Sequence, residues 1–408
     1  MFGSLNNEQT IERFEATDDG VKRYVRRRDN SEAMSYVSSS GTTDYDLAWL
    51  KSHQGSIVPD FNCTLRLADL FCGTGPMTLG VVEAGKALNI DIIPTFAIDF
   101  EPTASSNYAL NFPTSSVLTD DVTKFLNGEL GSTPTVEEQR LIDSVGNIDF
   151  VIAGPPCQGH SDLNNHTRRD DPRNLLLFRA CRFIEIFKPS YFIIENVQGI
   201  RHDKHDVLGT AKEFLSALGY EMKENLLLAS KYGVAQNRRR FLLVGSLTPL
   251  DIDLSHYEVV NAKSVSWAID DLPSSYDAES IFNSSATHSK TNQARIDYLF
   301  EHNLYELPYQ ERPLCQRKPT NRYTSVYGRM YPDQPAPTIT SGFGSVGQGR
   351  FCHPHFHRTL TPHEAARVQF IPDFFKFDNK LSRVALQKMI GNAVPPKLTY
   401  ILTLEMLR

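Results

Sequence analysis

Short apolar runs alternate with amphipathic segments through the middle of the chain, from Leu65 to about Leu247. The apolar runs have the length of strands and end at glycine, proline or acidic residues, which is typical of buried parallel strands. Strands are predicted at 65–71, 95–100, 116–119, 149–153, 191–197, 225–229 and 240–245, and helices at 76–85, 102–111, 174–187 and 207–218. This alternation predicts an α/β fold built on a doubly wound, mostly parallel sheet.

The two flanks of this region have a different pattern. Residues 1–62 are polar and form an N-terminal extension, in which the basic run Val21–Arg28 fits either a solvated helix face or an arm that touches phosphate. After about Leu247 the alternation stops, and the loop-rich composition predicts a smaller, irregular domain. Helical patterns return at 361–368 and 396–407.

Composition narrows the class of protein. The six cysteines form no C-x-x-C pair, so neither a zinc site nor a disulfide framework is indicated. No apolar run approaches the roughly 20 residues that cross a bilayer, and the polar N-terminus lacks a secretory signal. We therefore expect a cytoplasmic protein without a membrane or metal partner. The net charge of −6 argues weakly against nucleic acid, although local basic clusters are present.

A single cysteine, Cys157, follows the predicted strand 149–153 and the turn Gly154-Pro155-Pro156. Two prolines make this turn stiff, which suits a nucleophile that must be aimed. A structural thiol is the alternative from position alone. Glu195 ends the next apolar strand and is expected to face Cys157, because successive parallel strands end at one edge of a sheet. Burial would raise the pKa of Glu195, and a protonated carboxyl can donate to a ring nitrogen; a solvated strand terminus is the alternative.

A second pattern, Asp69–Gly80, is a strand, a glycine turn and a helix. Gly73 and Gly75 allow a ligand to approach the backbone at a helix N-terminus, but Thr78 replaces the third glycine of a dinucleotide fingerprint. Acidic and aromatic residues follow the next two strands, namely Asp99, Phe100 and Asp121. Such groups suit a ribose hydroxyl, an adenine ring and its amino group, so an adenosine-containing ligand is predicted, with tight strand–helix packing as the alternative.

Arginines precede the last predicted strand, in the segment Tyr232–Arg240. Guanidinium groups of Arg238 and Arg240 at this edge fit base oxygens or phosphates, and a bland basic turn is the alternative. Arg168 and Arg169, in the polar segment after Cys157, fit the same role.

Taken together, these residues resemble the DNA (cytosine-5)-methyltransferase family of the bacterial restriction-modification type. Six blocks occur in the family's order: Asp69–Gly80, Gly154–Gln158, Glu195–Val197, Gln236–Arg240, Arg358–Arg367 and Gly391–Pro396. Two positions depart from the family pattern. Pro76 stands where a further glycine is commoner, and Cys72 stands where a small residue is usual, which we interpret as packing.

The resemblance implies an S-adenosylmethionine-dependent, Rossmann-like methyltransferase that flips a cytosine out of duplex DNA. It implies Cys157 as the nucleophile at C6, Glu195 at N3 and Arg240 at O2, with Arg238 and Gln236 supporting the site. The S-adenosyl-L-methionine site that it implies comprises Phe71, Gly73, Gly75, Asp99, Phe100, Asp121, Pro155, Asn392 and Val394. By the same resemblance, residues 63–246 form the catalytic domain, 247–345 the target-recognition domain and 346–408 a segment that returns to the catalytic domain.

The resemblance also implies the partners. We expect double-stranded DNA as substrate, a monomeric enzyme and a functionally paired restriction endonuclease without a physical complex. Candidate DNA contacts in the recognition region are Arg312, Arg317, Lys318, Arg322, Tyr323, Tyr327 and Arg329. One alternative is methylation of a tRNA cytosine, although the Cys-Phe-Thr tripeptide of those relatives is missing. Another is a non-catalytic DNA-binding regulator, against which the intact catalytic blocks argue.

Overall fold

The structure is a computed structural model, and it describes residues 3–5, 10–17, 20–27, 37–38, 41–42, 44–56, 58–156, 175–203, 206–272, 280–317 and 325–408. Its centre is a seven-stranded sheet in the order β11-β13-β10-β9-β6-β7-β8. The strands are β6 (Cys63–Leu70), β7 (Ile90–Asp99), β8 (Ser116–Thr119), β9 (Phe150–Ala153), β10 (Tyr191–Asn196), β11 (Glu221–Leu228) and β13 (Arg239–Ser246). Only β13 in this sheet pairs antiparallel with its neighbours, so the expectation of a mostly parallel sheet is confirmed.

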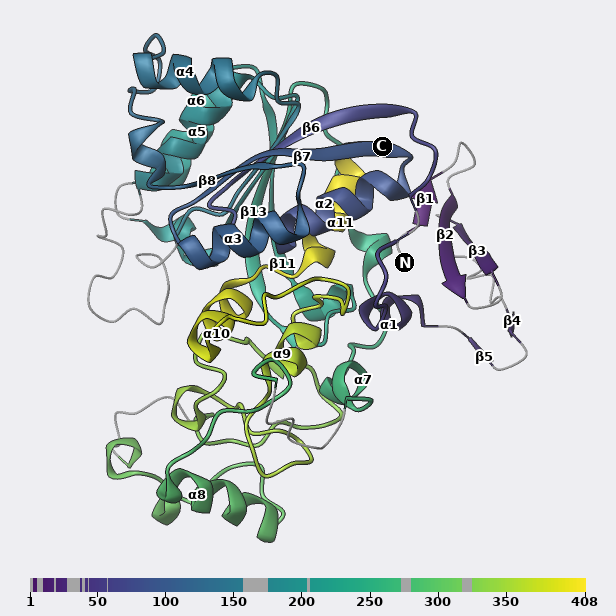
Figure 1. Ribbon diagram of the computed structural model, residues 1–408, viewed down its shortest axis with the longest axis vertical. Helices are drawn as coiled ribbons and strands as arrows, with labels where there is room; N and C mark the ends of the chain where they lie inside the picture. The colour runs from purple at the N-terminus through teal and green to yellow at the C-terminus, as the bar shows by residue number, and fades with distance from the viewer. Residues whose placement is uncertain are drawn as a thin grey trace.

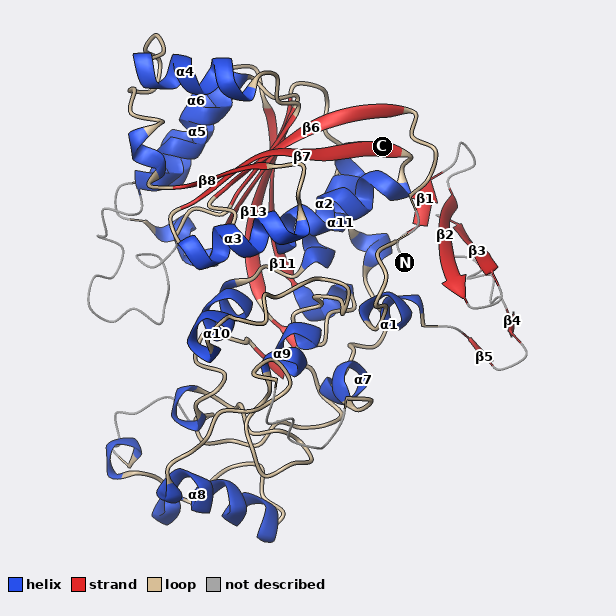
Figure 2. Ribbon diagram, viewed as in Figure 1, coloured by secondary structure: helices blue, strands red, loops and turns tan. Residues whose placement is uncertain are grey.

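Helices cover both faces of this sheet (Figures 1 and 2). One face packs against α4 (Val136–Val145), α5 (Leu176–Phe187) and α6 (Val207–Ala217), and the other against α2 (Pro76–Ala87), α3 (Pro102–Asn111) and α11 (Pro396–Met406). The strands are apolar on both sides because neighbouring residues point to opposite faces. On β9, for example, Phe150 and Ile152 join one core and Val151 and Ala153 join the other.

The C-terminal helix α11 lies directly against α2. Thr399 donates a hydrogen bond from Oγ1 to the carbonyl of Met77 at 2.9 Å. A Cβ at Gly80 would come within 2.1 Å of the carbonyl of Pro396, so only glycine permits this approach. The chain therefore returns from its far end to complete the packing of the helix that follows the first central strand.

A second lobe lies below the sheet in Figure 1 and contains few regular elements. Its helices are α7 (Val265–Ile269), α8 (Lys290–Glu301), α9 (Pro362–Val368) and α10 (Arg383–Asn392). A short parallel pair, β12 (Gln236–Asn237) with β14 (Ala336–Pro337), joins the lobe to the strand edge. Single turns of 3-10 helix occur at Val122–Lys124, Gln198–His202, Ala229–Tyr232, Ser255–Tyr257, Tyr309–Glu311, Leu314–Gln316 and Val346–Gln348.

The N-terminal extension carries structure that its polar composition did not predict. A three-stranded antiparallel sheet is formed by β1 (Gly3–Leu5), β2 (Thr10–Thr17) and β3 (Gly20–Arg27), followed by the short pair β4 (Val37–Ser38) and β5 (Gly41–Thr42). The helix alternative for the basic run is therefore wrong, since the chain is extended there. The helix α1 (Tyr45–Leu50) contributes Trp49 to the main core, stacked on Phe370 at 5.3 Å.

Most predicted elements of the sheet domain are confirmed to within a few residues, including α3 and β8 at their full bounds. Five helices in the described residues were not predicted: α1, α4, α7, α8 and α10. None of the helices in the described residues is long and apolar enough to cross a membrane.

Candidate active site

Three strand ends meet at the carboxyl edge of the sheet, from β6, β9 and β10. The amide of Gly154, just past β9, donates to the carbonyl of Leu70 at 3.0 Å. A Cβ built on Gly154 would lie 3.8 Å from Oε2 of Glu195 and 3.8 Å from the carbonyl of Phe71. The Gly-Pro-Pro turn, the carboxylate that ends β10 and the loop after β6 therefore share one small region, as the strand order predicted.

Glu195 is a buried carboxylate that forms an ion pair with an arginine of the neighbouring strand. It is 7% exposed, and its Oε1 lies 2.7 Å from Nε of Arg240 on the neighbouring strand β13. Burial raises the pKa of Glu195, while the charges of Arg240 and Arg238 oppose the shift. A carboxyl with a raised pKa stays protonated to a higher pH than a solvated glutamate, and in the protonated form it can donate a hydrogen bond.

Arg238 is more deeply buried than Glu195, and its guanidinium is directed into the protein interior. It is 1% exposed, and its guanidinium donates to the carbonyl of Ile339 at 2.7 Å and to the carbonyl of Gly391 at 3.1 Å. A longer contact of 3.5 Å reaches the carbonyl of Asn392. One side chain thus joins the sheet edge to the segment after the second lobe and to the end of α10.

Gln236 is fully buried, and both its amide oxygen and its amide nitrogen form hydrogen bonds within the protein. Its Oε1 accepts from the backbone N–H of Ile339 at 2.8 Å, and its Nε2 donates to Oε1 of Gln369 at 2.7 Å. Gln369 in turn donates to the carbonyl of Ile390 at 2.7 Å. Sequence reasoning missed Gln369, although a glutamine inside the apolar run Val368–Ile371 is a signal of a buried polar contact.

The glycine turn after β6 is held by Asp99 at the end of β7. The backbone N–H of Gly73 donates to Oδ2 of Asp99 at 2.8 Å, and that of Glu101 donates to Oδ1 at 2.8 Å. Burial raises the pKa of Asp99. An ionised carboxylate has about four acceptor positions, so two remain for a ligand.

Positive φ angles shape this turn at Phe71, Gly73 and Gly75. A Cβ at Gly75 would meet the ring of Phe112 at 2.5 Å, whereas a Cβ at Gly73 would meet nothing within 4 Å. Gly75 is therefore required by close packing, and the backbone at Gly73 faces open space at the start of α2.

A buried hydrogen-bonded group lies next to the glycine turn, at the start of α2. Thr78 donates from Oγ1 to Asp69 at 2.6 Å and lies 3.0 Å from the hydroxyl of Tyr108. Burial raises the pKa of Asp69 well above its ordinary value, although the hydrogen bond from Thr78 lowers it. Cys72 is buried beside this group, which agrees with its interpretation as packing.

The remaining predicted ligand residues lie around the same turn. Phe100 is 72% exposed, an unusual state for so large an apolar ring. Its neighbour Glu101 forms an ion pair with Lys388 of α10. Asp121 is exposed and caps the turn that follows β8 by accepting from the backbone N–H of Thr123 at 2.9 Å.

The structure describes some of the other predicted residues, and the rest lie outside the described ranges. Pro155 and Val394 are buried, and Asn392 is exposed at the end of α10. Arg312, Arg317 and Arg329 donate to backbone carbonyls of the second lobe. Cys157, Arg168, Arg169, Lys318, Arg322 and Tyr323 lie outside the described residues.

The profile of the C-5 cytosine-specific DNA methylase family matches residues 65–408, which include every described element from β7 to the C-terminal helix. The chain belongs to this family. The matched residues include both the glycine turn at Gly73 and the strand end at Glu195, so both parts of the candidate site belong to the family match.

Curated relatives agree with this membership. The chain is 48% identical to "Type II methyltransferase M1.BsuMI" of Bacillus subtilis (strain 168), over 98% of this chain and 96% of that protein. It is 29% identical to "Type II methyltransferase M.DdeI" of Desulfomicrobium norvegicum, over 83% of this chain and 87% of that protein.

Solved structures show the same fold. A putative DNA modification methyltransferase of an Escherichia coli prophage superposes with a TM-score of 0.62 at 24% identity, over 84% of this chain and 98% of that chain. Spodoptera frugiperda DNMT2, as a triple mutant, superposes with a TM-score of 0.55 at 17% identity, over 83% of this chain and 98% of that chain.

We predict that Arg238→Met destabilises the protein by about 3 kcal/mol or more, because two buried carbonyls lose their donor and each unmet group costs about 1–3 kcal/mol. Urea unfolding followed by circular dichroism measures the change. The neighbouring Arg239 is exposed and serves as a matched control, so Arg239→Met should stay within about 0.5 kcal/mol of the wild type. Equal losses in both variants would contradict the anchoring role of Arg238.

Proposed function

We propose that the protein methylates C5 of one cytosine within a short duplex DNA sequence, with S-adenosylmethionine as the donor, and that it serves a restriction-modification system. The observation that carries this proposal is the buried Glu195–Arg240 pair beside the Gly-Pro-Pro turn that leads to Cys157. The relatives' names as Type II methyltransferases support the restriction partner. A tRNA substrate is not favoured, because the family that matches this chain is described as a cytosine-specific DNA methylase.

We propose that three regions of the chain have different roles. Residues 63–246 would hold cofactor and catalytic groups, 247–345 would recognise the DNA sequence, and 346–408 would complete the catalytic domain. The packing of α11 on α2 and the bonds from Arg238 to Gly391 support the last assignment.

The cradle at the glycine turn fits S-adenosylmethionine. The backbone at Gly73 is open, the ring of Phe100 is exposed for stacking on adenine, and Asp99 keeps acceptor capacity for ribose hydroxyls. Asp121 would accept from the adenine amino group, and Pro155, Asn392 and Val394 would close the far side. When bound, the cofactor supplies an electrophilic methyl group on a sulfonium centre.

The catalytic residues would act on a cytosine flipped from the duplex. The Cys157 thiolate adds to C6 while Glu195, in its protonated form, gives its proton to N3. The electron pair then resides at C5, which takes the methyl group, and loss of the C5 proton expels Cys157. Covalent addition divides a difficult aromatic substitution into easier steps.

Two arginines would differ in role. Arg240 lies at the strand edge beside Glu195, where it can hold the carboxylate and donate to the cytosine O2. Arg238 and Gln236 have their donors on protein carbonyls and on Gln369, so we propose them as positioning residues. They would hold the segment at Ile339 and the end of α10 in a fixed position relative to the strand edge.

Methyl transfer is tested by bisulfite sequencing of plasmid DNA from cells that express the protein. We expect protected cytosines in one repeated short context, and none with Cys157→Ser, because a hydroxyl is a far weaker nucleophile than a thiolate. Soluble wild-type protein that protects no cytosine would contradict the proposal, as would protection that persists in Cys157→Ser.

The pH dependence tests Glu195. Because burial raises its pKa, the protonated donor is present below that pKa and is lost as pH rises through it, so the rate should fall on the alkaline side. Glu195→Gln should be slower by roughly 10²–10⁴-fold, since an amide cannot transfer the proton, and it should lack this decline. Single-turnover rates across pH measure both effects. An alkaline decline retained in Glu195→Gln would assign it to another group.

Cofactor binding is tested at Phe100. Loss of a stacked ring of this kind costs about 1 kcal/mol, so Phe100→Ala should raise the dissociation constant for S-adenosylhomocysteine about fivefold to tenfold, with stability unchanged. Isothermal titration calorimetry measures it. Leu110→Ala, at another exposed apolar residue on α3, is the control and should bind as the wild type does. Unchanged affinity in Phe100→Ala would remove the ring from the proposed adenine site.

A further inference from the structure

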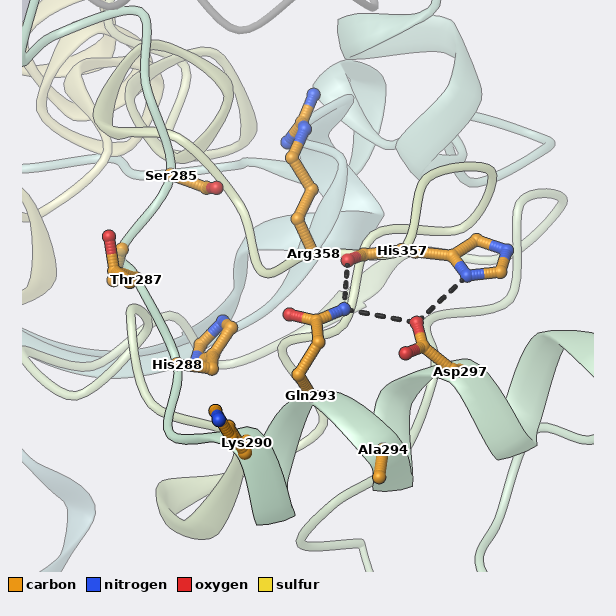
Figure 3. A pocket seen from close by; sticks show the side chains of 10 residues that line it. Ser285, Thr287, His288, Lys290, Gln293, Ala294, Asp297, His357 and Arg358 are labelled. Atoms are coloured by element: carbon orange, nitrogen blue, oxygen red, sulfur yellow. Dashed lines mark hydrogen bonds and ion pairs between the residues drawn. The ribbon is translucent and has the colours of Figure 1, made fainter.

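A cavity of about 620 Å³ lies in the second lobe, between the start of α8 and the loop that carries His357 (Figure 3). Polar groups of Ser285, Thr287, His288, Lys290, Gln293 and Asp297 line it. These residues take no part in the site at the strand ends. The cavity therefore needs an explanation of its own.

The side-chain amide of Gln293 has a fixed orientation in this cavity. Its Nε2 donates to Oδ1 of Asp297 at 3.0 Å and to the carbonyl of His357 at 2.9 Å. Asp297 is held in turn by Nδ1 of His357 at 3.0 Å. A carboxylate and a carbonyl only accept, so the amide nitrogen must face them and both its hydrogens are used. The amide oxygen of Gln293 is left turned toward the middle of the cavity, as Figure 3 shows.

Ser285 adds a second hydrogen-bonding group. The residue is 6% exposed, and its hydroxyl is directed into the space between the labelled side chains in Figure 3. A hydroxyl can donate one hydrogen bond and accept others, so it can bind a polar group that enters the cavity.

Among the described residues that line the cavity, two side chains are cationic, Lys290 and Arg358. Lys290 is the first residue of α8, is exposed, and stands at the positive end of the helix dipole. Arg358 is neutralised by a two-point ion pair with Glu364, at 2.7 and 2.6 Å. Lys290 therefore remains to meet a phosphate, while the interior presents the hydrogen-bonding groups of Ser285 and Gln293 beside the carboxylate of Asp297.

The helix α10 links the surroundings of this cavity to the segment that Arg238 contacts. Arg383, at its start, donates to Oγ of Ser284 at 2.8 Å, and Asn392, at its end, is contacted by Arg238. Ten residues of helix span about 15 Å, which is about four base pairs of DNA at about 3.4 Å each. The cavity is thus within reach of a short sequence around a flipped cytosine.

We propose that this cavity is a base-reading site, in which the amide oxygen of Gln293 accepts the exocyclic amino group of a cytosine or adenine near the target. Cytosine and adenine carry such a donor at their major-groove edge, whereas guanine and thymine present a carbonyl oxygen there. An oxygen facing the fixed oxygen of Gln293 is repelled, so the site selects both by attraction and by exclusion. Lys290 binds the adjacent phosphate. The inference rests on the DNA methylation proposed above.

The test is a plasmid library with randomised sequence, methylated by purified protein and analysed by deep bisulfite sequencing. For the wild type we expect a motif in which one position excludes guanine and thymine by roughly tenfold or more. Gln293→Met should reduce that discrimination to about twofold or less at this position alone, and Ser285→Ala should weaken it at the same position. Lys290→Ala should lower methylation uniformly across sequences and make it less sensitive to salt.

Gln139→Met is the matched control. Gln139 lies on α4 and donates to Asp143 one turn later at 2.9 Å, as Gln293 does to Asp297, but it is far from the second lobe. This control should keep the wild-type motif. An unchanged motif in both Gln293→Met and Ser285→Ala, or a loss spread evenly over all sequences, would overturn the base-reading site while leaving the methyltransferase proposal intact. A wild type that methylates nothing would overturn both.

Discussion

The buried guanidinium of Arg238 holds together segments that lie far apart in the sequence. Its donors reach carbonyls 101 and 153 positions further along the chain. Burying a charged group is costly unless it is paired or hydrogen-bonded, so the bonds from Arg238 to these carbonyls restrain the geometry as well as joining the parts. The end of α10, the segment at Ile339 and the strand edge can each take only one position relative to the others.

Around this anchor, the molecule places two chemically different environments next to each other. The Glu195 edge is buried, and burial raises the pKa of its carboxyl against the opposing charge of Arg240. The glycine turn nearby is open, with backbone at Gly73 and the ring of Phe100 exposed. A proton donor benefits from exclusion of water, whereas a cofactor needs a route in and out. The adjacent ends of β6, β9 and β10 satisfy both requirements.

The sheet and its edge were predictable because each depends on local patterns. Apolar runs that end in glycine or in an acidic residue set the strands, and parallel pairing brings Glu195 beside Gly154 without further information. Contacts between distant segments were not predictable in this way. Gln236 was expected to support the site, but its partners Ile339 and Gln369 lie more than 100 positions away and could not be predicted from local sequence. The helices α8 and α10 were missed because their mixed polar sequences bury few residues and their ends depend on tertiary contacts.

The contact between α2 and α11 has a consequence for biosynthesis. The bond from Thr399 to Met77 joins residues 322 positions apart, so α2 cannot complete its packing until α11 has been synthesised. Contacts between such distant residues are slow to form, because a long loop must close first. A nascent chain that lacks α11 would leave part of α2, next to the glycine turn, uncovered.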